Sequence, residues 1–203
     1  MMILASASPR RAELLRQVGL RFEVKPADID ETMLSTETPE QYVRRLSLEK
    51  ASAIYAKMRS DNQSSESTEA LGSLLVLGAD TIVVHKDQVF GKPSDCSEFK
   101  DTMNLLSGNR HQVMSAISVV SAQNSDTVVS LTDVYFRDLA ATEIDAYWQT
   151  GEPRDKAGGY AIQGLGASFV QRIEGSYSGV MGLPLFELSQ MLKRFGVFVF
   201  GEE

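Results

Sequence analysis

The chain has 203 residues, of which 43% are hydrophobic and 23% charged, the composition of a soluble globular protein. Its formal net charge of −7 argues against a general nucleic-acid binder, which usually carries a basic face. Its apolar runs are far shorter than the ~20 residues of a membrane helix. Because Cys96 is the single cysteine of the sequence, internal disulfides and thiolate zinc sites are excluded. Because the amino terminus also lacks the pattern of a signal peptide, we expect a cytoplasmic protein.

The first element is a short apolar strand, 3–5, which runs directly into a cationic helix start. Pro9 suits the first position of a helix, Ser8 would be its N-cap, and Arg10 and Arg11 follow at once. Because a helix N-terminus presents unpaired N–H groups and partial positive charge, the added guanidinium groups indicate an anion site. The alternative is an ordinary capped surface helix with solvated arginines.

Strand and helix patterns then alternate along the chain, which predicts an α/β fold with a mixed sheet. The expected strands are 21–24, 74–84, 89–90, 112–121, 127–136, 168–173 and 197–200. The expected helices begin at Pro39 and Pro184 or span 97–106 and 141–150. The polar stretch 59–73 has the composition of a solvated loop, and we expect one domain over residues 1–203.

Two acidic positions are candidates for chemistry. Asp80 lies inside an apolar strand pattern, where a carboxylate is costly to bury without a cation, a metal or a catalytic role. Glu31 follows Asp28 and Asp30 in a polar loop that could fold towards the same end of the sheet. Magnesium commonly takes one or two carboxylates together with substrate phosphates. The alternatives are an Asp80–arginine pair and a solvated acidic loop.

Two lysines and a glycine-rich segment complete the candidates. Lys50 lies in a helical pattern, which taken alone favours an exposed helix lysine. Lys92 stands between Gly91 and Pro93, in a backbone suited to close approach of a ligand, and a ligand site and a structural role are equally consistent with this setting. In the irregular stretch 155–164, the Gln163 amide could present a donor and an acceptor to a base edge, or simply belong to a tight turn.

Taken together, these segments resemble the Maf family of nucleoside triphosphate pyrophosphatases. The matching motifs occur in the family's order over nearly the whole chain: Leu-Ala-Ser-Ala-Ser-Pro-Arg-Arg at 4–11, Asp-Glu at 30–31, Glu-Lys-Ala at 49–51, Gly-Ala-Asp-Thr at 78–81, Gly-Lys-Pro at 91–93, Leu-Ser-Gly at 106–108, Asp-Lys-Ala-Gly at 155–158 and Gly-Leu-Pro at 182–184. Each motif alone is weak, but the ordered set is specific.

The resemblance implies an elongated mixed sheet flanked by helices, with two lobes around a central cleft. It also implies metal-dependent hydrolysis, with Mg²⁺ or Mn²⁺, between the α and β phosphates of a nucleotide, and a homodimer as one expected assembly. Carried over by matching position, Asp80 would be the general base and would share the metal with Glu31. The phosphates would be held by Ser8, Arg11, Lys50 and Lys92.

Base preference follows from three further positions of the resemblance. Arg10, Thr81 and Gln163 match the branch of the family that acts on dTTP and UTP, and not the branch that prefers 7-methyl-GTP. Two alternatives stay open. One is a nucleotide-binding regulator of septum formation or cell division with little hydrolysis, and the other is a pyrophosphatase for damaged purine nucleotides.

Overall fold

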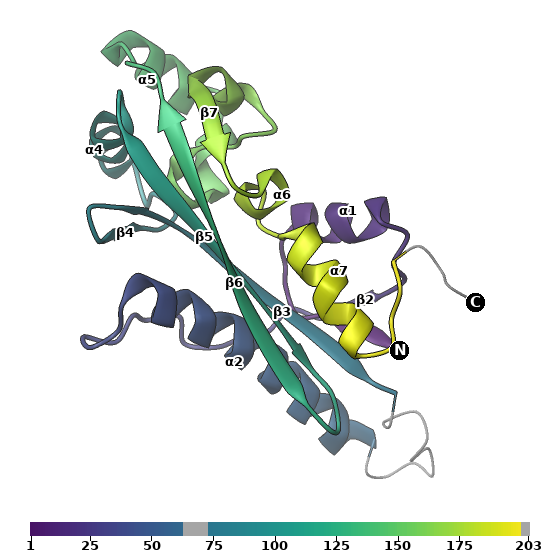
Figure 1. Cartoon of the computed structure of the whole chain (residues 1–203). Coiled ribbons are helices and arrows are strands. Elements are labelled where there is room, and N and C mark those ends of the chain that lie inside the picture. Colours follow the sequence, from purple (N-terminus) through teal and green to yellow (C-terminus); the bar gives the residue numbers. More distant parts are fainter. Residues whose placement is uncertain (63–72, 200–203) are drawn as a thin grey trace.

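The structure, a computed structural model, describes residues 1–62 and 73–199, and within them the chain forms a seven-stranded mixed sheet with helices on both faces (Figure 1). The strand order is β2-β1-β3-β5-β6-β7, with β4 paired to β3. The strands are β1 (Met2–Leu4), β2 (Glu23–Val24), β3 (Leu75–His85), β4 (Gln88–Phe90), β5 (Arg110–Val120), β6 (Ser125–Phe136) and β7 (Val170–Glu174). The helices are α1 (Pro9–Gln17), α2 (Pro39–Asn62), α4 (Cys96–Leu106), α5 (Ala141–Gln149), α6 (Tyr177–Val180) and α7 (Leu185–Arg194), with 3₁₀ turns η1 (Glu152–Asp155), η2 (Ala157–Gly159) and η3 (Leu165–Phe169). The predicted α/β class is confirmed.

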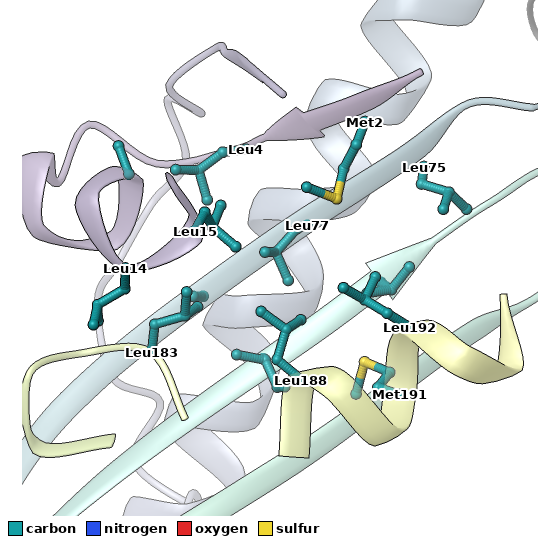
Figure 2. Close-up of a cluster of buried hydrophobic side chains, with 14 residues drawn as sticks. Met2, Leu4, Leu14, Leu15, Leu75, Leu77, Leu183, Leu188, Met191 and Leu192 are labelled. Carbon is teal, nitrogen blue, oxygen red and sulfur yellow. The ribbon is translucent and has the colours of Figure 1, made fainter. Parts of the chain in front are cut away.

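Strand β3 separates two layers because its side chains alternate between the faces of the sheet. Leu75, Leu77 and Ala79 pack with α1 and α7 in the cluster shown in Figure 2. Val76 and Ile82 point to the opposite face, where they pack beneath α2. One face of the first half of the sheet is therefore covered by α1 and α7 and the other by α2 (Figure 1).

A second packed region lies at the far end of the long strands, under α4 and α5 (Figure 1). It is rich in aromatic rings, among them Phe99, Phe136 and Tyr147. His111 is buried beside it with Nε2 2.8 Å from the Tyr160 hydroxyl, and burial lowers the pKa of this histidine to about 3. The neutral imidazole is thus part of the packing. The sheet has the expected elongated form, with one packed region at each end (Figure 1).

The edge of β3 that faces away from β5 carries a gap. Strand β1 pairs in parallel with residues 75–77, and β4 pairs in antiparallel fashion with residues 83–85. Between them, residues 78–82 have β5 on one side and, within residues 1–62 and 73–199, no strand neighbour on the other. The chain leaves β1 at this gap to begin α1, so the gap opens at the carboxyl end of β1, where α/β sheets commonly bind ligands.

Gly78 lets α2 approach β3 closely. A Cβ atom at this position would lie 2.1 Å from the Ser47 carbonyl oxygen and 2.8 Å from the Ala51 backbone nitrogen. Any larger residue would push the helix away from the strand. The hydrogen in place of a side chain therefore sets the distance between Lys50 on α2 and Asp80 on β3.

Three expectations are corrected: the strand at the carboxyl end, the extent of the polar loop and the start of β7. Residues 197–199 form no strand, and Phe200 lies outside the described residues. The Val197 N–H donates to the Leu192 carbonyl and Gly196 adopts a φ of 72°, so the chain closes the end of α7 instead of extending. Residues 59–62 belong to α2, and 63–72 lie outside the described residues. Residues 168 and 169 end η3, so β7 starts at Val170.

The contact at Gly78 gives a first prediction. Gly78→Ala should lower the free energy of unfolding by about 2 to 4 kcal/mol, because the added methyl group overlaps helix backbone that cannot give way. Chemical denaturation monitored by circular dichroism measures the change. Gly91→Ala is the matched control, since a Cβ there meets nothing within 4 Å; equal stability of the two variants would contradict the close approach.

Candidate functional site

A cleft of about 450 Å³ opens at the gap in the edge of β3, between the start of α1 and the 3₁₀ turns η1 and η2. Its walls come from segments far apart in the sequence. Eight of the predicted site residues line it: Ser8, Arg10, Arg11, Glu31, Lys50, Asp80, Thr81 and Lys92. Gln163 is exposed in the segment between η2 and η3 and is not among the lining residues.

A buried lysine joins the two predicted carboxylates. The Lys50 ammonium lies 2.7 Å from Asp80 Oδ1 and 2.7 Å from Glu31 Oε1. The Lys50 and Asp80 side chains are only 10% and 11% exposed, whereas Glu31 is 56% exposed. The alternative in which Asp80 pairs with an arginine is thus not what the structure shows, since Lys50 is its partner.

The loop that carries Glu31 is held by α2. The Tyr42 hydroxyl donates to the Glu31 carbonyl oxygen at 2.7 Å, and Arg45 donates to the Thr32 carbonyl at 3.0 Å. Arg45 also binds both carboxylate oxygens of Glu37 near the end of the same loop, and these bonds raise its pKa. Because one helix positions both the loop and Lys50, the Glu31 side chain is directed to the Lys50 ammonium.

The donor set suits a divalent cation that is shared with a substrate. Among the described residues, no three His, Cys, Asp or Glu side chains are placed to hold a metal ion. The Glu31 and Asp80 carboxylates face one point, which Lys50 marks, and Mg²⁺ commonly uses two such groups and completes its octahedron with phosphate oxygens and water. Asp28 is exposed and does not line the cleft, so it does not complete this set.

Arg11 crosses the cleft wall and joins three segments. Its Nε donates to the Gly182 carbonyl at 2.9 Å, and its Nη1 donates to Ser6 Oγ and to the Ala79 carbonyl at 3.1 and 2.8 Å. The Ala79 carbonyl belongs to the unpaired edge of β3, so Arg11 takes the place of a missing strand. Burial lowers the pKa of Arg11 while the Asp80 charge raises it, and the guanidinium stays protonated.

The hydrogen bonds beyond Arg11 have a defined direction. Ser115 is fully buried and its hydroxyl donates to the Gly179 carbonyl at 2.7 Å. It therefore accepts from Thr81 at 2.8 Å, and Thr81 in turn accepts from Arg11 Nη2 at 3.1 Å. With its single proton directed to Ser115, the Thr81 hydroxyl offers the cleft only a lone pair.

Ser8 occupies the N-cap position that the sequence predicts, but its side chain makes no capping hydrogen bond. Its backbone N–H donates to Ser6 Oγ at 3.2 Å instead. The hydroxyl of Ser8 is thus not used by the helix that it precedes, and it lies in the cleft wall beside Arg10.

Comparison with known proteins places the chain in a family. Residues 1–195 match the family described as Maf-like protein. The chain belongs to the Maf family. It is similar to proteins named dTTP/UTP pyrophosphatase from Pseudoalteromonas atlantica (49% identity, covering 97% of this chain and 98% of that protein) and Vibrio parahaemolyticus (50%, covering 96% of each). The solved Staphylococcus aureus Ham1 protein is 14% identical over 68% of this chain and 72% of its own, with a TM-score of 0.39.

Within this Maf protein, the charge of the cleft opposes the charge of the chain. The lining residues include five cationic side chains and three carboxylates, an excess of two positive charges in a chain with a net charge of −7. The cationic side chains are Arg10, Arg11, Lys50, Lys92 and Lys156. A polyanion is therefore the ligand class that the cleft favours.

Sequence reasoning assigned no role to several residues that build the site. Tyr42 and Arg45 read as ordinary positions of an amphipathic helix, and Ser115 as one residue of a buried strand. Lys156 lies within the Asp-Lys-Ala-Gly motif at 155–158, but no functional role was predicted for its side chain. Only the motif position of Lys156 offered a signal, because the other contacts depend on tertiary structure.

The contacts of Arg11 and Arg10 predict different effects on stability. Arg11→Ala should lower the free energy of unfolding by about 2 to 4 kcal/mol, because it removes four hydrogen bonds and leaves the Thr81 and Ala79 oxygens without their donors. Arg10→Ala, next to it, should change the same quantity by less than about 1 kcal/mol. Denaturant titrations of both variants measure the difference, and similar values for the two would contradict this assignment.

Proposed function

We propose that this Maf protein hydrolyses dTTP and UTP between the α and β phosphates, releasing the nucleoside monophosphate and pyrophosphate. The observation that carries the proposal is the Lys50–Asp80–Glu31 cluster inside a cationic cleft. It combines a base for water, ligands for a metal and cations for phosphate in one place. The names of the relatives, dTTP/UTP pyrophosphatase, support the choice of substrate.

Asp80 is the proposed general base. Its carboxylate lies at the unpaired edge of β3, at the floor of the cleft, and could accept the proton of a water molecule that attacks the α phosphorus. Lys50 donates to Oδ1 at 2.7 Å and so restrains the position of the carboxylate. A binding protein without hydrolysis would not need a carboxylate held in this way next to bound phosphates, since it would repel them.

Glu31 and Asp80 are the proposed ligands of a divalent cation, Mg²⁺ or Mn²⁺. When bound, such a cation would neutralise charge that develops on the phosphate oxygens. Lys50 now holds both of these carboxylates, so its ammonium is the group that would exchange partners, from carboxylate to phosphate oxygens. We propose that Arg11, Lys92 and the Ser8 hydroxyl donate further hydrogen bonds to the phosphate oxygens.

The preference for a pyrimidine base is proposed to depend on Arg10, Thr81 and Gln163. Arg10 and Thr81 line the cleft, and Thr81 fixes the Arg11 guanidinium through its oxygen. The Gln163 amide, with one donor and one acceptor face, would match the O4 and N3–H edge of uracil or thymine. The segment that carries Gln163 would have to turn towards the base for this contact.

Pyrophosphate release tests the reaction. With Mg²⁺ or Mn²⁺, release should be faster from dTTP and UTP than from CTP, ATP or 7-methyl-GTP. Asp80→Asn should lower kcat by about 10² to 10⁴-fold at saturating metal and substrate, because the variant keeps the shape of the side chain but loses the base and one charged metal ligand. Nucleotide binding without release, or full activity of Asp80→Asn, would refute the mechanism; equal or better turnover of 7-methyl-GTP would refute the base preference.

Removal of the metal is a separate test. Chelation with EDTA should abolish release, and Mg²⁺ or Mn²⁺ should restore it. Glu31→Gln should weaken Mn²⁺ binding in calorimetric titrations by roughly tenfold, the equivalent of losing one charged ligand. Asp28→Asn, in the same loop but outside the cleft, is the matched control, and equal effects of the two variants would exclude Glu31 as a ligand.

A further inference from the structure

A lysine of the cleft that the proposed reaction does not use lies opposite α1. Lys156 connects η1 to η2, lines the cleft, and has a side chain that is only 14% exposed. Lysine side chains are rarely so buried unless they are paired or serve a ligand. Its partner is its chain neighbour Asp155, which is 66% exposed and also lines the cleft.

The backbone around Lys156 is fixed against the second packed region. The Gly158 N–H donates to the Gly91 carbonyl at 2.9 Å, which places the segments of Lys156 and Lys92 side by side. Gly158 has a φ of 66°, and a Cβ there would lie 2.7 Å from the Val83 side chain, so the turn packs directly on β3. The two ammonium groups therefore project from adjacent, rigidly held segments of one wall.

The Asp155 carboxylate interacts with cations of both walls. Burial by itself would raise the pKa of Asp155, but the hydrogen bond from Lys156 and the charges of Lys156 and Arg10 lower it. Arg10 belongs to α1 on the opposite wall. Burial lowers the pKa of Arg10, and the negative charge of Asp155 is the strongest of the influences that raise it. The carboxylate thus lines the same cleft as Lys156 and Arg10 and is paired directly with Lys156.

We propose, building on the proposed function, that Lys156 is a further polyphosphate-binding residue and that Asp155 competes with phosphate for it. A phosphate chain offers Lys156 several anionic oxygens, whereas Asp155 offers one exposed carboxylate, whose ion pair is weak in water. Phosphate binding would replace the carboxylate at the ammonium. The remaining negative charge of Asp155 would then repel the phosphates and favour release of pyrophosphate.

The two members of the ion pair are expected to have opposite effects. Lys156→Gln should weaken binding of inorganic pyrophosphate, measured by calorimetry with Mg²⁺ present, by about tenfold, because one charge-assisted hydrogen bond is lost. Asp155→Asn should strengthen the same binding by about two- to threefold, because a repelling charge is removed. Lys156→Arg, which keeps the charge, should bind within about threefold of the unchanged protein.

A purely structural ion pair predicts a different pattern, since breaking it from either side would change binding in the same direction. Lys100→Gln and Asp145→Asn are the matched controls, because that pair is also close at 2.6 Å but lies on α4 and α5, outside the cleft lining. Melting temperatures confirm that each variant is folded. Weaker binding in both Lys156→Gln and Asp155→Asn, no change in Lys156→Gln, or no pyrophosphate binding by the unchanged protein would overturn the proposal.

The proposed reaction can fail independently of this assignment. If the unchanged protein releases no pyrophosphate from any nucleotide but binds pyrophosphate through Lys156, the proposed function fails and the binding residue stands. If the unchanged protein and Lys156→Gln hydrolyse dTTP with the same KM, the proposed function stands and the role assigned to Lys156 is wrong.

Discussion

The site depends on the close approach of α2 to β3 at Gly78. Because the helix backbone lies where a Cβ would be, Lys50 reaches Asp80 two residues further along the strand, at 2.7 Å. Both groups are nearly buried, and a buried ion pair gains little stability because each charge loses its water. A well-packed apolar pair would serve the fold as well. The charges are therefore better explained by chemistry at the cleft than by stability.

Because side chains alternate along β3, neighbouring residues of this strand contribute to different parts of the site. Asp80 faces α2 and its lysine, while Thr81 faces α1 and receives a hydrogen bond from Arg11. Two neighbouring residues thus connect two networks on opposite faces of the sheet. They meet in one cleft because, in the part of the chain that the structure describes, residues 78–82 have no neighbouring strand on that edge, so both faces open to the same space. A shift of one residue in the register of β3 would move Asp80 and Thr81 each to the opposite face and destroy both networks.

The sequence was sufficient for what depends on local pattern. Strand and helix positions follow from periodicity, and Asp80 stood out because a carboxylate interrupts an apolar run. Contacts between distant segments were out of reach: nothing in the sequence places the Gly182 carbonyl on Arg11, 171 residues away. The strand expected at 197–200 does not form over residues 197–199, because a short apolar run also suits a chain that folds back over a helix end. Gln163 shows the same limit, since its motif position gave no indication that it lies outside the cleft lining.

Two of the five cationic side chains of the cleft are already paired with carboxylates. Lys50 is held by Asp80 and Glu31, and Lys156 by Asp155, while the whole chain is acidic. Under the proposed function, the phosphates of a nucleotide would be drawn by the excess positive charge of the cleft but would have to replace these carboxylates at Lys50 and Lys156. Such exchange would cost binding energy in the ground state, but the carboxylates keep the ammonium groups oriented, so little reorganisation would remain when charge develops in the transition state. The same carboxylates would then be available to recover their lysines as pyrophosphate leaves. A cleft of unpaired cations would bind the substrate more tightly, but it would also bind the product pyrophosphate more tightly.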